Sequence, residues 1–391
     1  MAKQPIIITG GGIGGLAASV GLARIGVATV VLEQSSQFGE IGAGIQIAPN
    51  AFHCFDALGI GDQARAGAVF IDSLRLMDAL SGDEITAIPL DAQFRARFKN
   101  PYAVVHRVDL HGALLAFCVH SDLVDLRTSQ RVTRYDQDSD GVRAITDDGH
   151  VIKGHALIGA DGLHSAVRAQ LVGDGDPVIS GHTTYRSVIP ADKMPADLRW
   201  NAATLWAGPK CHIVHYPLKG GRLFNLVVTY HRDVKEAIVA KPVSKAEVAQ
   251  GFEHIAPRAR KIIEHGENWK LWVLCDREPI ANWIDGRVAL LGDAAHPMLQ
   301  YFAQGAAMAL EDGVCLARNI EAHDDIPAAF AAFQAARVTR TARVQMNSRL
   351  IGEYIYHPAG PEAAVRNAIM QDMSPQDWYD RLEWLYGSMG F

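Results

Sequence analysis

Cysteine is scarce and scattered in this sequence, and no C-x-x-C pair occurs. This spacing excludes a thiolate metal cage or a disulfide framework as the organising principle of the fold. No metal site is predicted from other residues, and we expect a reducing, cytoplasmic setting. The five cysteines are Cys54, Cys118, Cys211, Cys275 and Cys315.

Long apolar runs, repeats and a strong charge of one sign are also missing. No stretch is long and apolar enough to span a bilayer, and the first apolar run is too short for a signal peptide. The net charge of −6 argues against a polyanion as the main partner. With 391 residues, of which 49% are hydrophobic, the chain is long and apolar enough for two globular domains.

A glycine-rich stretch near the beginning organises the rest of the chain. Residues 5–33 read PIIITGGGIGGLAASVGLARIGVATVVLE. The isoleucines at 6–8 predict a buried strand, and the small residues from 16 to 25 predict a helix. Residues 28–32 predict a second buried strand. The order of these elements is β-α-β.

Gly10, Gly12 and Gly15 form the pattern G-x-G-x-x-G between the first strand and the helix. Gly10 permits the tight turn, Gly12 lets the backbone approach a pyrophosphate, and Gly15 lets the helix pack closely on the strand. The start of the helix offers free N–H groups to phosphates. Glu33, after the second strand, can accept hydrogen bonds from ribose hydroxyls. The stretch predicts a dinucleotide site, although NAD and FAD use the same device.

Two segments that follow also point to a ligand. Residues 39–50, GEIGAGIQIAPN, are either an ordinary loop or a backbone that passes close to a flat ligand. Residues 103–117 predict a strand that ends at Arg107 and a helix capped by Asp109. Arg107 at this junction could meet a phosphate or the ribityl chain of a flavin, or make an ordinary surface ion pair.

The middle of the chain is rich in predicted strands. Residues 124–158 predict antiparallel strands, which lead into ALIGADGLHSAVR at 156–168. There a buried strand ends in a turn at Asp161, the place where open α/β sheets bind their ligands. Residues 178–231 predict an inserted sheet that forms the floor of a substrate pocket, and residues 244–265 return to helix.

A third landmark lies at residues 286–317, GRVALLGDAAHPMLQYFAQGAAMALEDGVCLA. A buried strand ends in a Gly-Asp turn at Asp293. A helix begins near Gly305 and carries Ala306 in its first turn, where its N-terminus can meet electron-rich oxygen or nitrogen. The remainder of the chain predicts helices whose aromatic residues pack in the core or between subunits.

Three motifs therefore occur in order: GGGIGG at 10–15 with Glu33, GADG at 159–162 and LLGDAAHP at 290–297. Together they resemble the single-component FAD-dependent aromatic hydroxylases over nearly the whole chain. The resemblance implies bound FAD, NADH as a transient co-substrate, O2, a small aromatic acid as substrate, and a homodimer. The chain has no second dinucleotide fingerprint, which matches a family without a separate NAD(P)H domain.

The resemblance also implies which residues hold FAD. Asp293 would bind the ribityl chain, and the backbone at Gly305 and Ala306 would meet the flavin ring. Asp161 is associated with both FAD and the nicotinamide cofactor. The adenine-dinucleotide part would contact Gly10, Gly12, Gly15, Glu33 and Arg107.

The predicted fold class is α/β. It combines a Rossmann-type FAD-binding domain, an inserted β-rich substrate domain and a helical C-terminal segment. The FAD-binding domain would comprise 1–177, with interleaved antiparallel strands, and 276–325. The substrate domain would comprise 178–275, and the helical segment 326–391.

A finer resemblance points to the branch of this family that hydroxylates 3-hydroxybenzoate at C6. By this resemblance His212, Tyr216 and Gln300 line the aromatic substrate. Salicylate 1-hydroxylases tend not to carry a glutamine at the position of Gln300. The segments that carry this resemblance are 208–221, 276–283, 294–301 and 384–387.

These three residues suit the expected chemistry. Oxygen activated on the reduced flavin attacks ring carbons made electron-rich by a phenol, and a phenolate activates the ring further. A histidine with a pKa of about 6.5 is a natural base for a phenol near pKa 10. His212 would take the phenolic proton, Gln300 would hold the same oxygen, and Tyr216 would position the ring. Attack para to the hydroxyl of 3-hydroxybenzoate gives 2,5-dihydroxybenzoate, which is gentisate.

Several residues keep more than one interpretation. His212 and Tyr216 are four apart on one face of a predicted strand, and that face could simply be core. His296 could be a base, but beside Asp293 it more plausibly shapes the turn. Arg186 and Lys210 are candidates for the substrate carboxylate, and neither is assigned.

Three alternative functions stay open. Another hydroxylase of the family would act on salicylate or a hydroxylated pyridine carboxylate and would differ in its product. An NAD-dependent dehydrogenase would use the N-terminal fold, and the Gly-Asp turn at Asp293 argues against it. A non-catalytic flavin-binding protein would keep the fold, but we expect it to lose the polar residues of the pocket.

Overall fold

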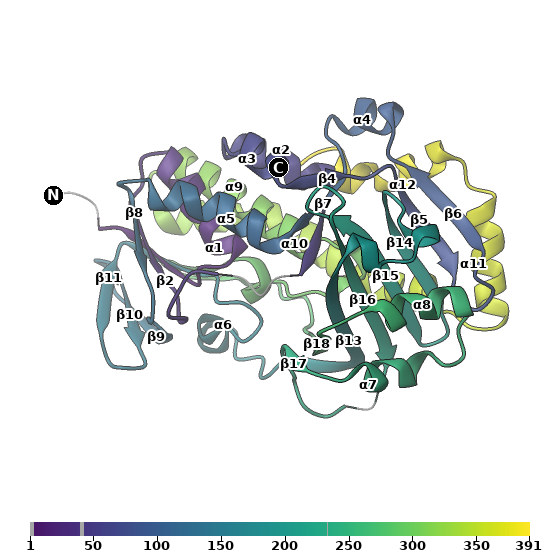
Figure 1. Ribbon diagram of the computed structural model, residues 1–391. Helices are drawn as coiled ribbons and strands as arrows, with labels where there is room; N and C mark the ends of the chain where they lie inside the picture. The colour runs from purple at the N-terminus through teal and green to yellow at the C-terminus, as the bar shows by residue number, and fades with distance from the viewer. Residues whose placement is uncertain (1–3, 40–42, 233) are drawn as a thin grey trace.

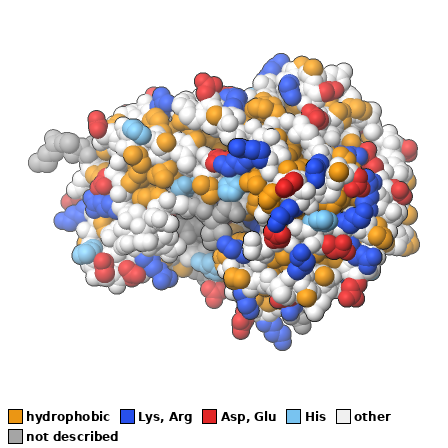
Figure 2. Space-filling model, viewed as in Figure 1, with side chains coloured by type: hydrophobic (Ala, Val, Ile, Leu, Met, Phe, Trp, Pro, Cys, Tyr) orange, Lys and Arg blue, Asp and Glu red, His pale blue; other side chains and the backbone are white. Residues whose placement is uncertain are grey.

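The computed structural model describes residues 4–39, 43–232 and 234–391, and Figure 1 shows two lobes in them. One lobe holds a mostly parallel sheet with the first helices of the chain. The other holds a large, mostly antiparallel sheet. Lysine, arginine and acidic side chains are interspersed over the face shown in Figure 2, as the modest net charge leads one to expect.

The first lobe is built on a six-stranded sheet of order β19-β20-β12-β1-β2-β8. Five of its strands run parallel, and β19 pairs antiparallel with β20. Every residue of β1, β2 and β12 is buried, because both faces of the sheet are covered. The strands are β1 (Ile6–Thr9), β2 (Thr29–Leu32), β8 (Val124–Arg127), β12 (Ala156–Gly159), β19 (Ile284–Asp285) and β20 (Val288–Leu290).

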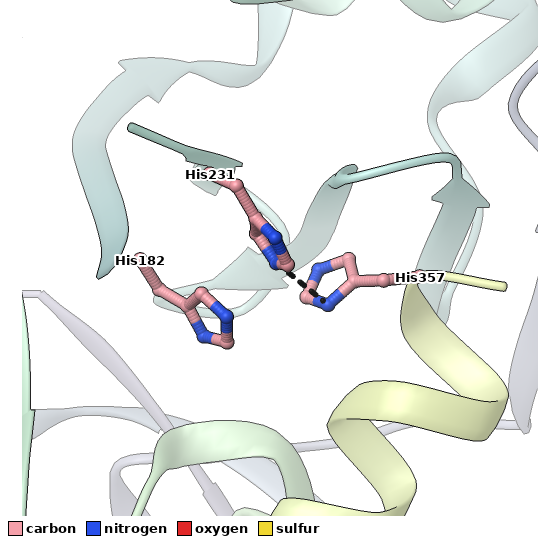
Figure 3. Close-up of side chains that lie close together, drawn as sticks. All are labelled: His182, His231 and His357. Carbon is pink, nitrogen blue, oxygen red and sulfur yellow. Dashed lines mark hydrogen bonds between the residues drawn. The ribbon is translucent and has the colours of Figure 1, made fainter. Parts of the chain in front are cut away.

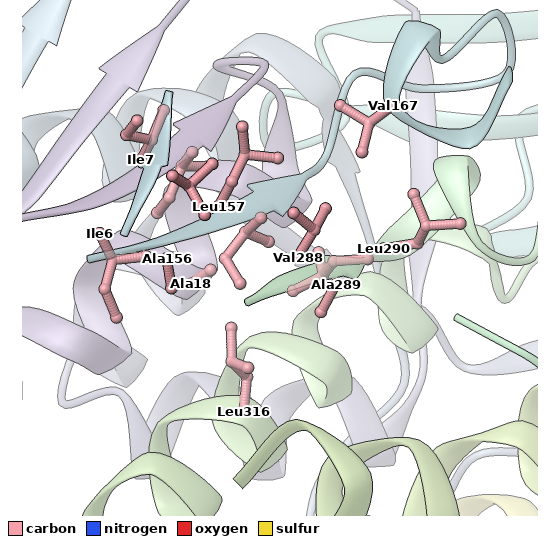
Figure 4. Packing of buried hydrophobic residues seen from close by; sticks show 14 of the residues in the cluster. Ile6, Ile7, Ala18, Ala156, Leu157, Val167, Val288, Ala289, Leu290 and Leu316 are labelled. Atoms are coloured by element: carbon pink, nitrogen blue, oxygen red, sulfur yellow. The ribbon is translucent and has the colours of Figure 1, made fainter. Parts of the chain in front are cut away.

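Helices cover one face of this sheet and a small antiparallel sheet covers the other. Helix α1 (Ile13–Arg24) packs against α9 (Gly305–Ala322), and Ala18 and Leu316 lie under the strands in Figure 4. Tyr135 and Ile152 belong to the same apolar cluster from the opposite side. The small sheet comprises β9 (Val132–Gln137), β10 (Val142–Thr146) and β11 (Val151–Gly154).

The second lobe is built on an eight-stranded sheet of order β17-β18-β13-β16-β15-β14-β5-β6. Helices α7 (Lys245–Ala249) and α8 (Pro257–His265) pack on its outer face through an apolar cluster. Its inner face turns toward the first lobe. The strands are β5 (Ser73–Asp78), β6 (Glu84–Pro89), β13 (Val178–Pro190), β14 (Ala202–Gly208), β15 (Cys211–Leu218), β16 (Leu223–His231), β17 (Lys241–Pro242) and β18 (Lys270–Asp276).

The strands β5 and β6 correct the predicted domain boundary. They lie within 1–177, yet β5 pairs in parallel with β14 and so belongs to the substrate sheet. Alternating apolar residues identify a strand, but they do not say which distant strand it pairs with. A cut at residue 178 therefore divides the second sheet.

Shorter elements join the lobes. A three-stranded sheet of β3 (Gly44–Ile47), β7 (Ala103–His106) and β4 (Ala68–Phe70) lies at the junction, with β7 beside β15. Part of the predicted crossing segment, residues 40–42, lies outside the described residues. The accompanying helices are α2 (Pro49–Ala57), α3 (Gly61–Ala66), α4 (Ala92–Phe98), α5 (Arg107–Val119) and α6 (Ala166–Leu171).

The C-terminal segment is helical, as predicted. The long helix α10 (Ile326–Ile351) runs from the first lobe to the second and continues into a π-helical turn, η6 (Gly352–Tyr356). Helices α11 (Pro361–Gln371) and α12 (Pro375–Tyr386) follow. Tyr379 and Tyr386 of α12 are buried against Phe94 and Phe98, so these aromatic residues pack in the core.

Two local predictions were wrong. Asp109 does not cap a helix, because α5 already begins at Arg107, and its carboxylate instead pairs with Lys219 at 2.5 Å. The strands within 124–158 are not all antiparallel, because β8 and β12 join the parallel sheet.

Among the described helices, none combines the length and apolar character that a membrane crossing requires.

Candidate active site

A cavity of about 420 Å³ lies between the two lobes. The glycine-rich turn, the Gly-Asp turn and the first turn of α9 line one side, and the inner face of β15 lines the other. The structure thus gathers in one cavity most of the predicted site residues, although they come from distant parts of the chain. Those that line it are Gly12, Arg107, His212, Tyr216, Asp293, Gln300, Gly305 and Ala306.

Gly10 and Gly15 do not line the cavity but shape the turn beside it. Gly10 has φ +101°, and a Cβ there would lie 2.3 Å from the Ala160 carbonyl oxygen. A Cβ on Gly15 would lie 2.0 Å from the carbonyl oxygen of Gly10. Only glycine fits at either position without a backbone shift.

The start of α1 lines the cavity, and no described side chain caps it. Gly12 precedes the helix in an extended conformation, and Gly12, Ile13 and Gly14 all line the cavity. The first N–H groups of a helix lack intrahelical partners, and the helix dipole adds partial positive charge. This arrangement fits the pyrophosphate of a dinucleotide.

Glu33 directly follows β2, as predicted, and also has a structural role. Its Oε2 accepts a hydrogen bond from the Gly11 amide at 2.8 Å, and its Oε1 accepts one from the Ser35 amide at 2.8 Å. These bonds fix the carboxylate beside the glycine turn, and each oxygen keeps a further lone pair for a ribose hydroxyl.

The region predicted to hold the flavin contains polar groups that a bound ligand can satisfy. Asp293, in η4 (Gly292–Ala294), lines the cavity and is exposed. Gln304 precedes α9 without capping it, so the first amides of that helix are open to the cavity. Its Oε1 accepts from Asn50 at 2.9 Å, but its buried Nε2 has no partner within the described residues. Such orphaned donors beside a glycine-rich cradle fit FAD.

Asp161 is not among the residues that line the cavity, and its carboxylate supports the start of α6, whose N-cap is Ser165. It accepts hydrogen bonds from the Ser165 hydroxyl at 2.5 Å and the Ala166 amide at 2.8 Å, and so holds the start of α6. Burial raises the pKa of its carboxyl group. Contact between Asp161 and a cofactor stays a prediction.

Helix α6 connects the second motif to the third through Arg168, which sequence reasoning left without a role. This arginine is fully buried, pairs with Asp174 and donates to the carbonyl oxygens of Ala294 and Ala295 at 3.0 and 2.9 Å. It thereby fixes the Gly-Asp turn. No local pattern distinguishes Arg168 from an exposed arginine of a short helix.

His296 shapes the same turn. Its Nε2 lies 2.6 Å from Oδ2 of the buried Asp312, and that oxygen also accepts from the Gly292 amide at 2.9 Å. Arg337 pairs with the other oxygen at 2.7 Å. Burial alone would raise the pKa of Asp312, but His296 and Arg337 lower it to about 2. These contacts agree with the structural interpretation of His296.

On the substrate side, His212 and Tyr216 point into the cavity from one face of β15, as predicted. Nδ1 of His212 lies 2.8 Å from Nε2 of His357, whereas its buried Nε2 has no partner among the described residues. Burial, aided by neighbouring histidines, holds the pKa of His212 well below its usual range. Burial raises the pKa of Tyr216, whose hydroxyl bonds to no described residue.

Gln300 lines the cavity, but its amide is engaged by the protein. Its Oε1 accepts from Nη2 of Arg186 at 3.1 Å, and its Nε2 donates to the hydroxyls of Thr184 and Thr229 at 3.2 and 3.3 Å. Its predicted contact with the phenolic oxygen stays untested. What the structure adds is a fixed link between Gln300 and an arginine.

Arg186 is the candidate carboxylate partner that the fold brings into the cavity. Its guanidinium lies 5.2 Å above the ring of Trp272, and no described carboxylate pairs with it. Burial lowers its pKa. Lys210, the other candidate, lies in the turn between β14 and β15 and does not line the cavity.

A group of three histidines lies beyond His212, and sequence reasoning did not foresee it. His182 and His231 are cross-strand partners whose rings stack at 4.0 Å, and His357 faces them from the end of η6 (Figure 3). Their nitrogens lie within 4.8 Å of one another, close enough for a metal ion. Stacked rings direct their lone pairs side by side, however, and His182 Nδ1 already bonds the Tyr301 hydroxyl. Hydrogen bonding describes this group better than coordination.

Comparison with known proteins agrees with this geometry. The model of the FAD binding domain family matches residues 3–347. The chain is 53% identical over 382 residues to 3-hydroxybenzoate 6-hydroxylase 1 of Aquipseudomonas alcaligenes, covering 98% of this chain and 97% of the relative. It is 50% identical to 3-hydroxybenzoate 6-hydroxylase of Polaromonas naphthalenivorans, covering 99% and 96%.

Solved structures share the whole fold. Klebsiella pneumoniae HpxO complexed with FAD and uric acid has a TM-score of 0.85 at 26% identity, covering 97% of this chain and 95% of the other. A salicylate hydroxylase substrate complex has a TM-score of 0.82 at 24% identity, covering 98% and 95%. The predicted α/β fold and the FAD cofactor are confirmed. The chain belongs to the FAD binding domain family and, within it, to the FAD-dependent aromatic monooxygenases.

Proposed function

We propose that this enzyme hydroxylates 3-hydroxybenzoate at C6, para to its hydroxyl, and forms 2,5-dihydroxybenzoate with NADH and O2 as co-substrates. One observation carries the proposal: a single cavity is lined by buried His212, whose Nε2 has no partner among the described residues, and by Arg186, whose guanidinium pairs with no described carboxylate. These groups match the phenol and the carboxylate of the substrate. The names of two relatives at least 50% identical support the same reaction.

His212 is the proposed base. A free phenol has a pKa near 10 and is mostly neutral at physiological pH, so its activation requires a proton acceptor. Burial lowers the pKa of His212, which keeps the imidazole neutral. Its Nδ1 is engaged by His357, so Nε2, which has no partner among the described residues, is the atom left to receive the proton.

Arg186 is the proposed partner of the substrate carboxylate. A guanidinium can hold a carboxylate through two parallel hydrogen bonds. Arg186 and Tyr216 are close enough to shift each other's pKa, which supports a position of the substrate carboxylate near Tyr216. Gln300 joins Arg186 to Thr229, the cross-strand partner of His212, and so fixes the spacing between the two ends of the pocket.

FAD would be held by the amides at the start of α1, Glu33, Arg107, Asp293 and the first turn of α9. When bound and reduced by NADH, it activates O2 for transfer of one oxygen atom to the ring. The cavity wall around His212 then excludes water from the reacting ring, because the side chain is only 1% exposed. We also propose that Asp161 influences the nicotinamide cofactor through the turn that it holds.

The test is NADH oxidation by the purified yellow protein in air, with 3-hydroxybenzoate or salicylate, followed by chromatography of the products. The proposal requires 2,5-dihydroxybenzoate from 3-hydroxybenzoate. Catechol from salicylate, without product from 3-hydroxybenzoate, would show that the enzyme is a salicylate hydroxylase. NADH consumption that ignores every aromatic acid would favour a flavin-binding protein without hydroxylase activity.

We further propose that the enzyme is a cytoplasmic homodimer whose second copy covers the C-terminal helices. Several large apolar side chains are exposed there, and a groove between η6 and α11 is lined mainly by apolar residues. Light scattering on the native protein and on Val365→Asp tests this arrangement. A monomeric native protein would overturn it. The exposed residues are Met346, Leu350, Tyr354, Val365 and Ile369.

A further inference from the structure

His212 is buried, so a proton that it accepts from a substrate needs a path to solvent. Its side chain is only 1% exposed, it lines the cavity that the substrate would fill, and its Nε2 has no partner among the described residues. A base that cannot release this proton stays protonated and cannot accept another one. The remaining exit from the ring is Nδ1, which lies 2.8 Å from Nε2 of His357.

His357 continues the path toward the surface. It follows η6, and its own Nδ1 lies 3.3 Å from Nε2 of His231 (Figure 3). His231 is the last residue of β16 and is partly exposed. Two hydrogen bonds therefore join the buried substrate base to a histidine that meets solvent.

The nitrogen atoms alternate in the order that proton transfer requires. A neutral imidazole has one donor and one acceptor nitrogen. With hydrogen on each Nδ1, His212 donates to His357, His357 donates to His231, and Nε2 of His212 is left as an acceptor. Both observed contacts join an Nδ1 to an Nε2.

We propose that His212, His357 and His231 form a proton relay that carries the phenolic proton of the substrate to solvent. The phenolic O–H bond breaks as Nε2–H forms on His212. The Nδ1 proton of His212 passes to Nε2 of His357, and the Nδ1 proton of His357 passes to Nε2 of His231. Nδ1 of His231 releases a proton to water, so one proton enters, one leaves, and a phenolate stays in the pocket.

The surroundings favour passage over storage of the proton. Burial lowers the pKa of His357 to about 3 and lowers that of His231, so neither imidazole holds the proton at neutral pH. Among the described residues, the other titratable groups that face the three rings are His182, Tyr301, Tyr356 and Lys210, and none is a carboxylate. No described negative charge would therefore trap a cation along the path.

The relay rests on the proposed function in one respect, because it requires a phenol that loses its proton at His212. The test mixes oxidised holoenzyme with the phenol that it hydroxylates in weak buffer containing a pH indicator. Stopped flow then records proton release together with the phenolate absorbance. His357→Gln keeps a hydrogen-bonding side chain but cannot relay, so we expect both rates to fall about 100-fold. His182→Gln, which alters the same group outside the path, is the matched control.

Two further measurements distinguish a proton relay from a purely structural role of His357. In His357→Gln, added imidazole should restore proton release in proportion to its concentration, and the dissociation constant of the substrate should change little. His231→Gln should show a smaller loss, because water can accept directly from His357, and it serves if His357→Gln fails to fold. Equal release rates in wild type, His357→Gln and His231→Gln would overturn the relay.

Failure of the proposed function looks different. Wild-type enzyme that hydroxylates salicylate instead would release its proton through the same path, and the variants would test it with that substrate. Wild-type enzyme that releases no proton on binding any hydroxylated substrate would overturn the relay itself.

Discussion

The two sides of the cavity are built in different ways. On the cofactor side the polar groups are largely backbone amides, set by turns in which Gly10 and Gly15 leave no space for a side chain. On the substrate side they are side chains of β13, β15, β16 and the short turn η5 (Gln300–Phe302), and hydrogen bonds from Gln300 join β13 to β16. Damage to the first side should cost folding and FAD binding, whereas damage to the second should cost rate or affinity with the flavin retained.

The largest expected effect tests the substrate side. His212→Gln removes the proposed base, and we expect kcat to fall about a thousand-fold, or about 4 kcal/mol, with FAD content unchanged. Steady-state product formation and flavin absorbance per protein measure the two quantities. Activity within tenfold of wild type would show that the phenol loses its proton elsewhere.

The next effect concerns the buried charges that support the cofactor side. Asp312→Asn leaves Arg337 and His296 without their common carboxylate, and we expect the free energy of unfolding to fall by about 3 kcal/mol. The pKa of Asp312 is lowered to about 2 in the folded protein. Its stabilisation is therefore complete above the unfolded pKa of about 3.9 and is lost as the pH falls toward 2.

Urea unfolding at several pH values measures this contribution. The wild type should lose stability between pH of about 4 and about 2, and Asp312→Asn should lose less over the same range. Identical slopes for the two proteins would contradict the lowered pKa.

The glycine turn gives an effect of intermediate size. Gly15→Ala places a methyl group against the Gly10 carbonyl, and we expect about 2 kcal/mol of destabilisation together with loss of FAD. Gly112→Ala is the control, because a Cβ there meets no atom within 4 Å. Thermal unfolding measures the stability of both variants, and flavin absorbance per protein measures their FAD content. An unchanged flavin content in Gly15→Ala would show that the turn can adjust.

The smallest expected effect concerns Arg186, on the substrate side of the cavity. Arg186→Gln should raise the dissociation constant of 3-hydroxybenzoate about tenfold, or about 1.4 kcal/mol, which is near the lower end of what a hydrogen bond to a charged group contributes. Binding of 3-methylphenol, which lacks the carboxylate, should change much less. Titration of the flavin absorbance with both ligands provides the measurement. An equal loss for both would indicate that Arg186 supports the pocket without touching the carboxylate.

The sequence predicted the cofactor side more completely than the substrate side, for a physical reason. The glycine turn, Glu33 and the start of α9 are local features, in which neighbours in sequence are neighbours in space. The helix that begins at Gly305 was therefore placed at the correct residue. Such local structures depend mainly on neighbouring residues, so they can be predicted without knowledge of the rest of the fold.

The substrate side depends on pairings between distant segments. His182 meets His231 only because β13 pairs with β16, and His357 reaches them from the end of η6. The approach of Arg186 to Gln300 spans 114 residues of sequence. No periodicity encodes such contacts, so the role of His212 came from resemblance, whereas its partners came from the structure.

The course of α10 determines whether the enzyme can be divided into modules. The helix leaves the nucleotide lobe and is bound to β18 by an Arg349–Asp276 ion pair of 2.7 Å. The η6 turn that follows brings Tyr356 to the cavity and leads to His357, which bonds His212. A fragment that ends before α10 would keep the dinucleotide fingerprint yet lack one wall of its reaction chamber. Lobe exchange between relatives should therefore transfer α10 and η6 together with the substrate sheet.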